Sequence, residues 1–194
     1  MACQNIRDFC IDAGETFHPV IRWATDVLVS KPITAITQAA PAVITATSHG
    51  VPNGWQAAVV SAGGMTQINS TRYPPKGKDL HRVTVLTVNT IAFNDINAAD
   101  FSAYTSGGFL VYNTPISLSG ATASMKIWDN PENSGTPLLA LTEISGITLD
   151  TINNTITPSF ATTSLTWSTG YYDLNITDTT GITTQVLTGV ITIE

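Results

Sequence analysis

The segment GGMTQINSTRY, residues 63–73, contains paired glycines, one of the few short patterns that can cradle a phosphate. A Walker loop requires Lys-Ser or Lys-Thr after its last glycine, and a dinucleotide-binding loop requires glycines spaced to open a helix. Here Met65, Thr66 and Gln67 follow Gly64, and no helical period follows that would offer an N-terminal dipole to an anion. The pair therefore predicts a tight turn in which glycine adopts a positive φ.

Three histidines are available for acid–base or nucleophilic chemistry: His18, His49 and His81. A catalytic triad needs a Ser or Cys nucleophile, a His and an acid, and chain order alone does not exclude one. The sequence contains no Gly-x-Ser-x-Gly elbow, and none of the three histidines lies in a catalytic motif. We therefore expect solvated or capped histidine side chains and no catalytic residue.

The acidic residues indicate neither a metal loop nor a defined pair for glycoside cleavage. The segment DNPENSG, residues 129–135, has its glycine at the seventh position instead of the sixth and no Glu at the twelfth, so we expect a hairpin turn. Glycoside cleavage needs two carboxylates about 5–9 Å apart, which chain spacing does not reveal. The available acids are Glu132, Glu143, Asp150 and Asp173. The sequence therefore predicts no enzyme, no metal and no cofactor.

Four tryptophans, Trp23, Trp55, Trp128 and Trp167, stand among strand-like segments. Aromatic side chains at strand positions usually serve the core or an interface, and we expect that role here. The alternative is a sugar-stacking platform, in which Trp55 and Trp128 are presented to a glycan on a host surface.

A basic run accompanies the segment PPKGKDLHR and comprises Arg72, Lys76, Lys78 and Arg82. Loop charges of this kind are most often simply solvated. The net charge of −6 argues against a specific nucleic-acid partner, because nucleic-acid binders are usually basic. The run is instead a candidate interface that would pair head-to-tail with an acidic part of the next subunit, and such heterologous contacts close into rings.

Cys3 and Cys10 have no neighbours of the metal-binding type. Two cysteines are too few for a disulfide scaffold, which favours reduced structural thiols. A second hypothesis is an intersubunit disulfide that locks an assembly in an oxidising medium. The segment MACQNIRDFC lacks the regions of a secretory signal, and the apolar runs are shorter than the ~18 residues of a membrane span. We therefore expect a soluble protein made in the cytoplasm, with no membrane partner.

Apolar and polar residues alternate along most of the chain, which is the period of half-buried strands. The segments TFHPVIRW, ATASMKIW, YYDLNITD and TTQVLTGVITI show this period, and turn signals such as HGVPNG, YPPKG and NPENSG separate the strands. Charged residues make up only 11% of the chain and hydrophobic residues 43%, a composition too apolar for disorder. The sequence predicts an all-β protein.

Two prolines, Pro32 and Pro115, bracket a segment of different charge. Residues 32–115 carry four Lys or Arg and three Asp, for a net charge of +1, whereas the remainder carries four basic against eleven acidic residues, for a net charge of −7. A shift in composition between two X-Pro steps indicates a domain boundary. We therefore predict an outer β-domain, residues 1–31 and 116–194, split by an inserted β-domain of residues 32–115.

The inserted segment resembles a known module. Its motifs are SHG at 48–50, GGMTQIN at 63–69 and YTSGG at 104–108. They are similar to those of a small β-barrel found in phage tail and virion proteins, which is named FCCH-like for its similarity to the first catalytic cysteine half-domain of ubiquitin-activating enzymes. The segment contains no cysteine, so the resemblance implies the fold without ubiquitin chemistry. The loop PPKGKDLHR, residues 74–82, is longer and more basic than the module's usual connection.

The outer segments, when joined, resemble small phage structural proteins. FCIDAGETF, residues 9–17, is similar to their opening strand pair, and a Met-x-Ile strand, GITL, YDL and the final GVITI follow in the family's order. The resemblance implies an Ig-like β-sandwich split by an inserted small β-barrel domain. It also implies a non-enzymatic virion protein of the tail, neck or baseplate, a ring, collar or adaptor subunit with other virion proteins as partners. A host-glycan-binding module of a phage tail or fibre is the alternative.

Overall fold

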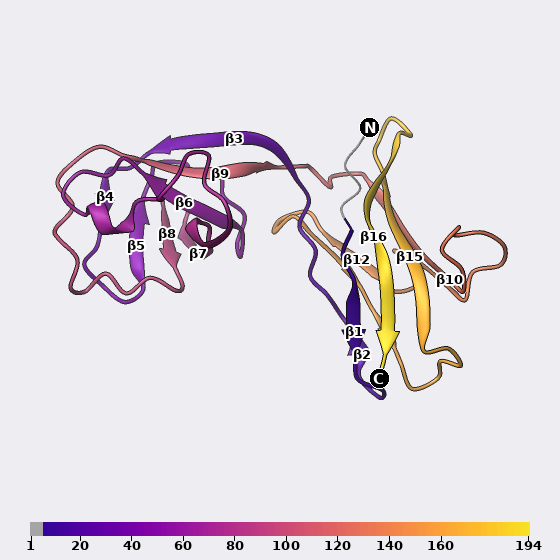
Figure 1. The fold of residues 1–194 in the computed structure, drawn as a ribbon. Coiled ribbons are helices and arrows are strands. Elements are labelled where there is room, and N and C mark those ends of the chain that lie inside the picture. Colours follow the sequence, from indigo (N-terminus) through magenta and orange to yellow (C-terminus); the bar gives the residue numbers. More distant parts are fainter. Residues whose placement is uncertain (1–5) are drawn as a thin grey trace. The chain divides into compact units, whose positions relative to one another are not determined.

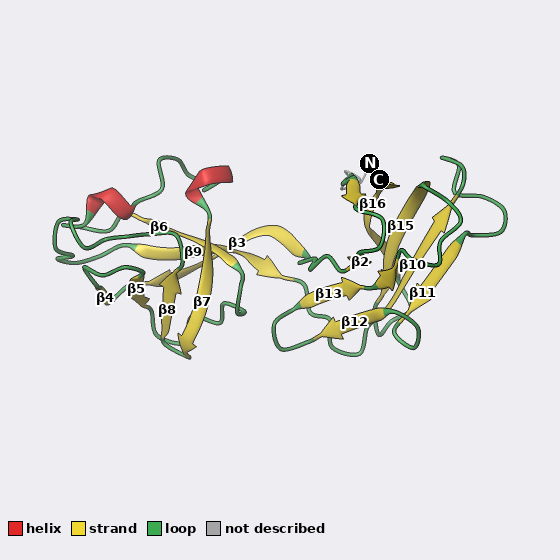
Figure 2. Ribbon diagram, turned by 90° about the horizontal axis from the view of Figure 1, so that it is seen from below, coloured by secondary structure: helices red, strands yellow, loops and turns green. Residues whose placement is uncertain are grey.

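The computed structural model describes residues 6–194, and strands dominate it. The helices of the described part are two single turns of 3-10 helix, Thr66–Ile68 (η1) and Gly77–Asp79 (η2), drawn red in Figure 2. None of its helices is long and apolar enough to cross a membrane. The prediction of an all-β chain is confirmed, because the alternating Val, Ile and Thr residues form the strands that their β-branched side chains favour.

The chain packs as two compact units. One unit contains residues 6–23 and Ser117–Glu194, and the other contains Ala24–Ile116. The chain returns from the second unit to the first after Ile116, beside the expected boundary at Pro115. It enters the second unit at Ala24, earlier than the expected boundary at Pro32. The reason is that residues Ala24–Pro32 form strand β3, which pairs with β9 (Phe109–Pro115) inside the second unit.

The first unit has a five-stranded main sheet in the order β1-β16-β15-β10-β11 (β1 is labelled in Figure 1 and β11 in Figure 2). Its strands are β1 (Phe9–Ile11), β10 (Thr122–Trp128), β11 (Leu139–Thr142), β15 (Thr169–Thr177) and β16 (Thr183–Ile193). The neighbouring pairs are antiparallel except β1 and β16, which are parallel with Phe9 opposite Ile191.

Two short ladders form the other layer of this unit. They are β12 (Ile147–Asp150) with β13 (Thr155–Pro158), and β2 (Thr16–Phe17) with β14 (Phe160–Ala161). An antiparallel bridge joins Ile156 of β13 to Ile21, which follows β2 in the chain. Phe17, Ile147 and Ile156 join residues of the main sheet in one buried cluster, so the unit is a β-sandwich.

Strand β15 illustrates how the period of two builds this core. Tyr172, Leu174 and Ile176 are buried, whereas the residues between them are half-buried on the opposite face. The Tyr172 hydroxyl donates a hydrogen bond to the Arg7 carbonyl oxygen at 2.6 Å, which satisfies the one polar atom of a buried ring. Burial raises the pKa of Tyr172.

The second unit has a seven-stranded sheet in the order β3-β9-β6-β7-β8-β5-β4 (Figure 1). The strands not yet given are β4 (Ala35–Ile36), β5 (Ala42–Thr45), β6 (Gln56–Val60), β7 (His81–Thr87) and β8 (Thr90–Phe93). One face of the sheet carries a buried cluster that includes Ile44, Val59, Phe93 and Leu110.

No ladder among the described residues closes this sheet into a barrel. The two edge strands, β3 and β4, are joined directly by Ile33 and Thr34. The Ile33 amide donates to the Gly108 carbonyl at 3.0 Å, and the Thr34 amide donates to the Thr45 carbonyl at 2.9 Å. The predicted inserted domain is therefore an open sheet whose two edges are linked by the chain itself, without the continuous ladder of a closed barrel.

Candidate functional site

The Gly63–Gly64 pair forms a bend after β6 and holds no phosphate-type loop. The Gly63 amide donates to the Ser106 carbonyl at 2.8 Å, and the Thr105 amide donates to the Gly63 carbonyl at 3.0 Å. Gly64 has a φ of +77°, and a Cβ there would collide with the Ala103 carbonyl oxygen. The predicted turn with positive φ is confirmed at Gly64, whereas Gly63 is needed because the Ser106 backbone approaches closely.

His49 and His81 contact neighbouring groups of the fold, whereas His18 is exposed. The Val51 amide donates to His49 Nδ1 at 3.0 Å, and His49 Nε2 lies 3.0 Å from the Thr87 carbonyl oxygen, so this buried ring caps backbone groups as expected. His81 Nδ1 lies 3.0 Å from an Asp95 carboxylate oxygen. Among residues 6–194, no cluster of three or more His, Cys, Asp or Glu could hold a metal ion.

The tryptophans proposed as a glycan platform are buried. Trp55 is 3% exposed and donates its indole N–H to the Asn113 carbonyl at 3.1 Å, and Trp128 is 6% exposed. Neither ring offers a face to a ligand, because each packs inside its own unit. This corrects the alternative that placed Trp55 and Trp128 at a glycan, and it agrees with the expectation of a core role.

The cysteine hypothesis concerns only one described residue. Cys10 is an exposed, free cysteine on β1, and Cys3 lies outside the described residues. Partial desolvation of the Cys10 thiol, with the neighbouring Glu194 carboxylate, raises its pKa. The thiolate that forms disulfides is therefore less populated at neutral pH than in an ordinary cysteine. The intersubunit disulfide stays a prediction.

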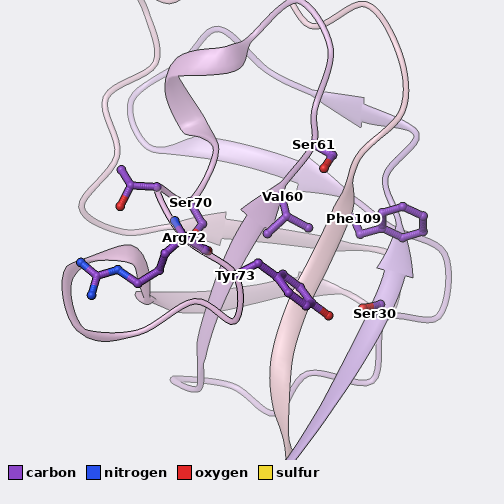
Figure 3. Close-up of a pocket in the computed structure, with 8 residues that line it drawn as sticks. Ser30, Val60, Ser61, Ser70, Arg72, Tyr73 and Phe109 are labelled. Carbon is purple, nitrogen blue, oxygen red and sulfur yellow. The ribbon is translucent and has the colours of Figure 1, made fainter.

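Residues 70–80, which we call the basic loop, lie across the outer face of the β3-β9-β6 layer, the face turned away from the core. One depression is lined by residues 70–73 of the loop together with Val60 of β6 and Phe109 of β9 (Figure 3). A second depression is lined by residues 74–77 together with Leu28 of β3 and Asn113 of β9. The loop and the strands beneath it line both depressions, so the loop packs on the outer face of this layer.

A buried carboxylate anchors the loop. The side chain of Asp79 is 5% exposed and accepts hydrogen bonds from the Thr71 amide at 3.1 Å and the Thr71 hydroxyl at 2.9 Å. The Arg72 Nε lies 3.0 Å from the other carboxylate oxygen. The Thr71 amide, with the Thr71 hydroxyl and Arg72, lowers the pKa of Asp79 in spite of its burial.

The four basic residues do not form one free cluster. Arg72 is held by Asp79, so its charge is balanced inside the loop. Lys76 and Lys78 are exposed on either side of Gly77 at η2, and Arg82 is exposed on β7. The candidate interface thus consists of Lys76, Lys78 and Arg82, with Arg72 in a structural role.

The first depression contains two exposed aromatic side chains that sequence reasoning missed. Tyr73 is 67% exposed and Phe109 is 44% exposed, and the hydroxyls of Ser30 and Ser61 lie at the same depression (Figure 3). Its volume is about 540 Å³. The alternation along FLVYN places Phe109 on the sheet face opposite to that of the buried Leu110, so its exposure follows from the sequence. No local pattern predicts that Tyr73 lies beside Phe109.

No protein-family model and no curated protein matches the chain. The likeness to phage modules therefore depends on the quoted motifs alone. The structure accounts for two of them physically. In SHG, the His49 ring contacts the Thr87 carbonyl oxygen at the turn between β7 and β8, and GGMTQIN forms the close backbone bend at Gly63.

We expect acid to loosen the loop through Asp79. A carboxylate whose folded pKa is lowered stabilises the fold above its unfolded pKa of about 3.9, and that contribution is lost as pH falls through the folded pKa. Asp79→Asn should be less stable than wild type at neutral pH, and the difference should shrink below about pH 4. Urea denaturation of both proteins from pH 7 to pH 2 checks this. A constant difference across that range would contradict the anchor.

The bend at Gly64 should tolerate no side chain. Gly64→Ala should lower the free energy of unfolding by about 3 kcal/mol or more, because a Cβ collides with the Ala103 carbonyl at a positive φ. Gly77→Ala is the matched control: its φ is also positive, at +58°, but nothing lies within 4 Å of the added Cβ. It should cost only about 1 kcal/mol. Thermal denaturation of the two variants separates the cost of the steric collision from the cost of the positive φ. Equal losses of unfolding free energy would contradict the predicted collision at Gly64.

Proposed function

We propose that the chain is a non-enzymatic structural subunit of a phage virion, an Ig-like sandwich carrying an FCCH-like module, which joins a ring or collar of the tail, neck or baseplate. It is made in the host cytoplasm and acts in the virion by binding copies of itself and other virion proteins. The resemblance of the motifs supports the setting. The observation that carries the mode of assembly is the opposite net charge of the two packed units.

The charge difference persists when the structural boundaries replace the predicted ones. The first unit contains three Lys or Arg against ten Asp or Glu, a net charge of −7, and Ala24–Ile116 contains five against four, a net charge of +1. Each unit has its own apolar core, so this inequality is not required for packing. Charges distributed in this way attract unlike units of neighbouring copies and repel like units.

The basic partner surface is Lys76, Lys78 and Arg82. The Asp79 anchor fixes the part of the chain that presents the two lysines, so their placement costs less conformational entropy on binding than a free loop would. Arg82 extends from the adjoining strand β7. We call these three residues the basic surface.

The acidic partner surface lies at the turn after β1. Asp12 and Glu15 flank that turn, and the Ala13 amide donates to the Glu194 carbonyl at 2.6 Å. The Glu194 amide in turn donates to the Ile11 carbonyl at 3.0 Å. These bonds bring Asp12, Glu15 and Glu194 together, and all three residues are exposed. We call them the acidic surface.

Contact through these surfaces is favoured over addition of a strand to β3. This nine-residue edge strand has a register shift between Ala24 and Leu28 and ends in Lys31 and Pro32. A bulge, a lysine and a proline are the features that protect sheet edges from pairing with another chain. The proposed interface is therefore made by surface side chains, and because the two surfaces differ, successive contacts run head-to-tail. We propose that the rotation between neighbouring copies closes them into a ring.

The basic surface should control self-association. Lys76→Glu/Lys78→Glu should weaken it by about tenfold or more, because each reversal turns an attraction into a repulsion of about 1 kcal/mol at an exposed rim. Native mass spectrometry and sedimentation at low salt measure the effect, and wild-type association should fall as salt screens the charges. Lys76→Glu alone should weaken association by a smaller factor. Its matched control is Lys31→Glu, a single reversal on β3, which should change little.

A charge swap makes the test specific. Asp12→Lys/Glu15→Lys should weaken association alone and restore it when mixed with Lys76→Glu/Lys78→Glu, since the two surfaces are then complementary again. Association that is unaffected by either reversal, or a mixture that does not recover, would contradict the proposed head-to-tail contact.

A further inference from the structure

The depression beside the loop has a composition distinct from the rest of the second unit's surface. The large rings Trp55, Phe93 and Tyr112 of this unit are buried, whereas Tyr73 and Phe109 expose 67% and 44% of their surface at one depression. Phe109 is the register neighbour of Val60 on β6, so the two side chains lie on the same face of the sheet. Exposed rings gathered at a hollow indicate a surface that is covered by a ligand.

Apart from Arg72, the polar side chains that line the depression carry hydroxyls. Ser30 comes from β3 and Ser61 follows β6, and neither side chain forms a hydrogen bond within residues 6–194. Ser61 is held at a φ of +58°, a conformation that non-glycine residues adopt rarely and that gathers at functional sites. A hydroxyl both donates and accepts, so these groups match a ligand whose own groups do the same.

The depression offers no net charge to a ligand. Arg72 is the one charged residue among those that line it, and its guanidinium is balanced by Asp79. Figure 3 also shows the Arg72 side chain extending to the side opposite the rings of Tyr73 and Phe109. No carboxylate lines the depression. A phosphorylated or acidic ligand therefore meets only an arginine that is already paired with a carboxylate.

We infer that this depression binds a neutral oligosaccharide. The two ring faces cover the apolar C–H faces of sugar rings, and the hydroxyls of Ser30 and Ser61 exchange hydrogen bonds with sugar hydroxyls. An extended peptide fits less well. Strand β9 is paired on both sides, and the one edge strand at the depression, β3, carries a register shift, Lys31 and Pro32. A peptide would therefore lack a regular strand edge, which gives peptides their affinity.

The site is separate from the proposed self-association. Residues 70–73 line the saccharide site, whereas Lys76 lines the second depression together with the other residues of 74–77. Saccharide binding therefore adds a recognition role to the structural one, and variants of the rings leave the basic surface intact.

Two-dimensional NMR of the full-length, isotope-labelled chain tests the site. The probes are neutral hexasaccharides of glucose, galactose, mannose or N-acetylglucosamine at about 10 mM, which reveals a millimolar Kd. At least one should shift the amides of Ser30, Ser61, Tyr73 and Phe109. Tyr73→Ala and Phe109→Ala should each weaken binding by about tenfold. Tyr73→Phe, which keeps the ring, should bind like wild type, and Lys76→Glu should bind normally.

The inference would be overturned by the absence of any shift with every probe, by shifts elsewhere in the chain, or by binding that survives both alanine substitutions. Selective binding of a proline-rich peptide at the same amides would also overturn it and identify the depression as a peptide site. Because Lys76→Glu tests self-association and the ring variants test the sugar, the two proposals fail separately.

Discussion

The exposed chemistry of the second unit depends on one buried carboxylate. Asp79 accepts hydrogen bonds from Thr71 and an ionic contact from Arg72, and it stays charged because these donors replace water. The anchor closes the loop over the outer sheet face, which sets Tyr73 beside the first depression and the two lysines at η2. Without this anchor the loop would keep its sequence but lose the geometry that both proposals use.

The two units differ in net charge although each packs around an apolar core of its own. Each unit buries its own apolar cluster, so the packing of the cores leaves the surface charge of each unit open to vary. The proposed assembly contact and the proposed saccharide contact use different parts of one loop: the lysines near η2 for the first, and Tyr73 for the second, together with Ser30 and Ser61 from outside the loop. A single anchored segment can therefore serve two contacts that mutations can resolve.

Much of the fold was predictable because it depends on local alternation. The strands with Met125 and Leu174, and the bend at Gly64, follow from the period of two and from the φ that glycine allows. The site was less predictable because it depends on long-range contacts. Nothing in the spacing of Asp79 and Thr71 reveals their hydrogen bond, and Trp55 was predicted as a platform or core residue until burial settled its place. The start of β3 at Ala24, too, is set by pairing with β9 and not by Pro32.

Quantitative mass spectrometry of purified phage particles whose genome encodes this chain tests the structural role most directly, with its copy number set against the capsid protein. A ring on the tail axis predicts that the chain is present in every particle at about six or twelve copies. Absence of the chain from mature particles would contradict the structural role, whatever the purified protein binds in solution.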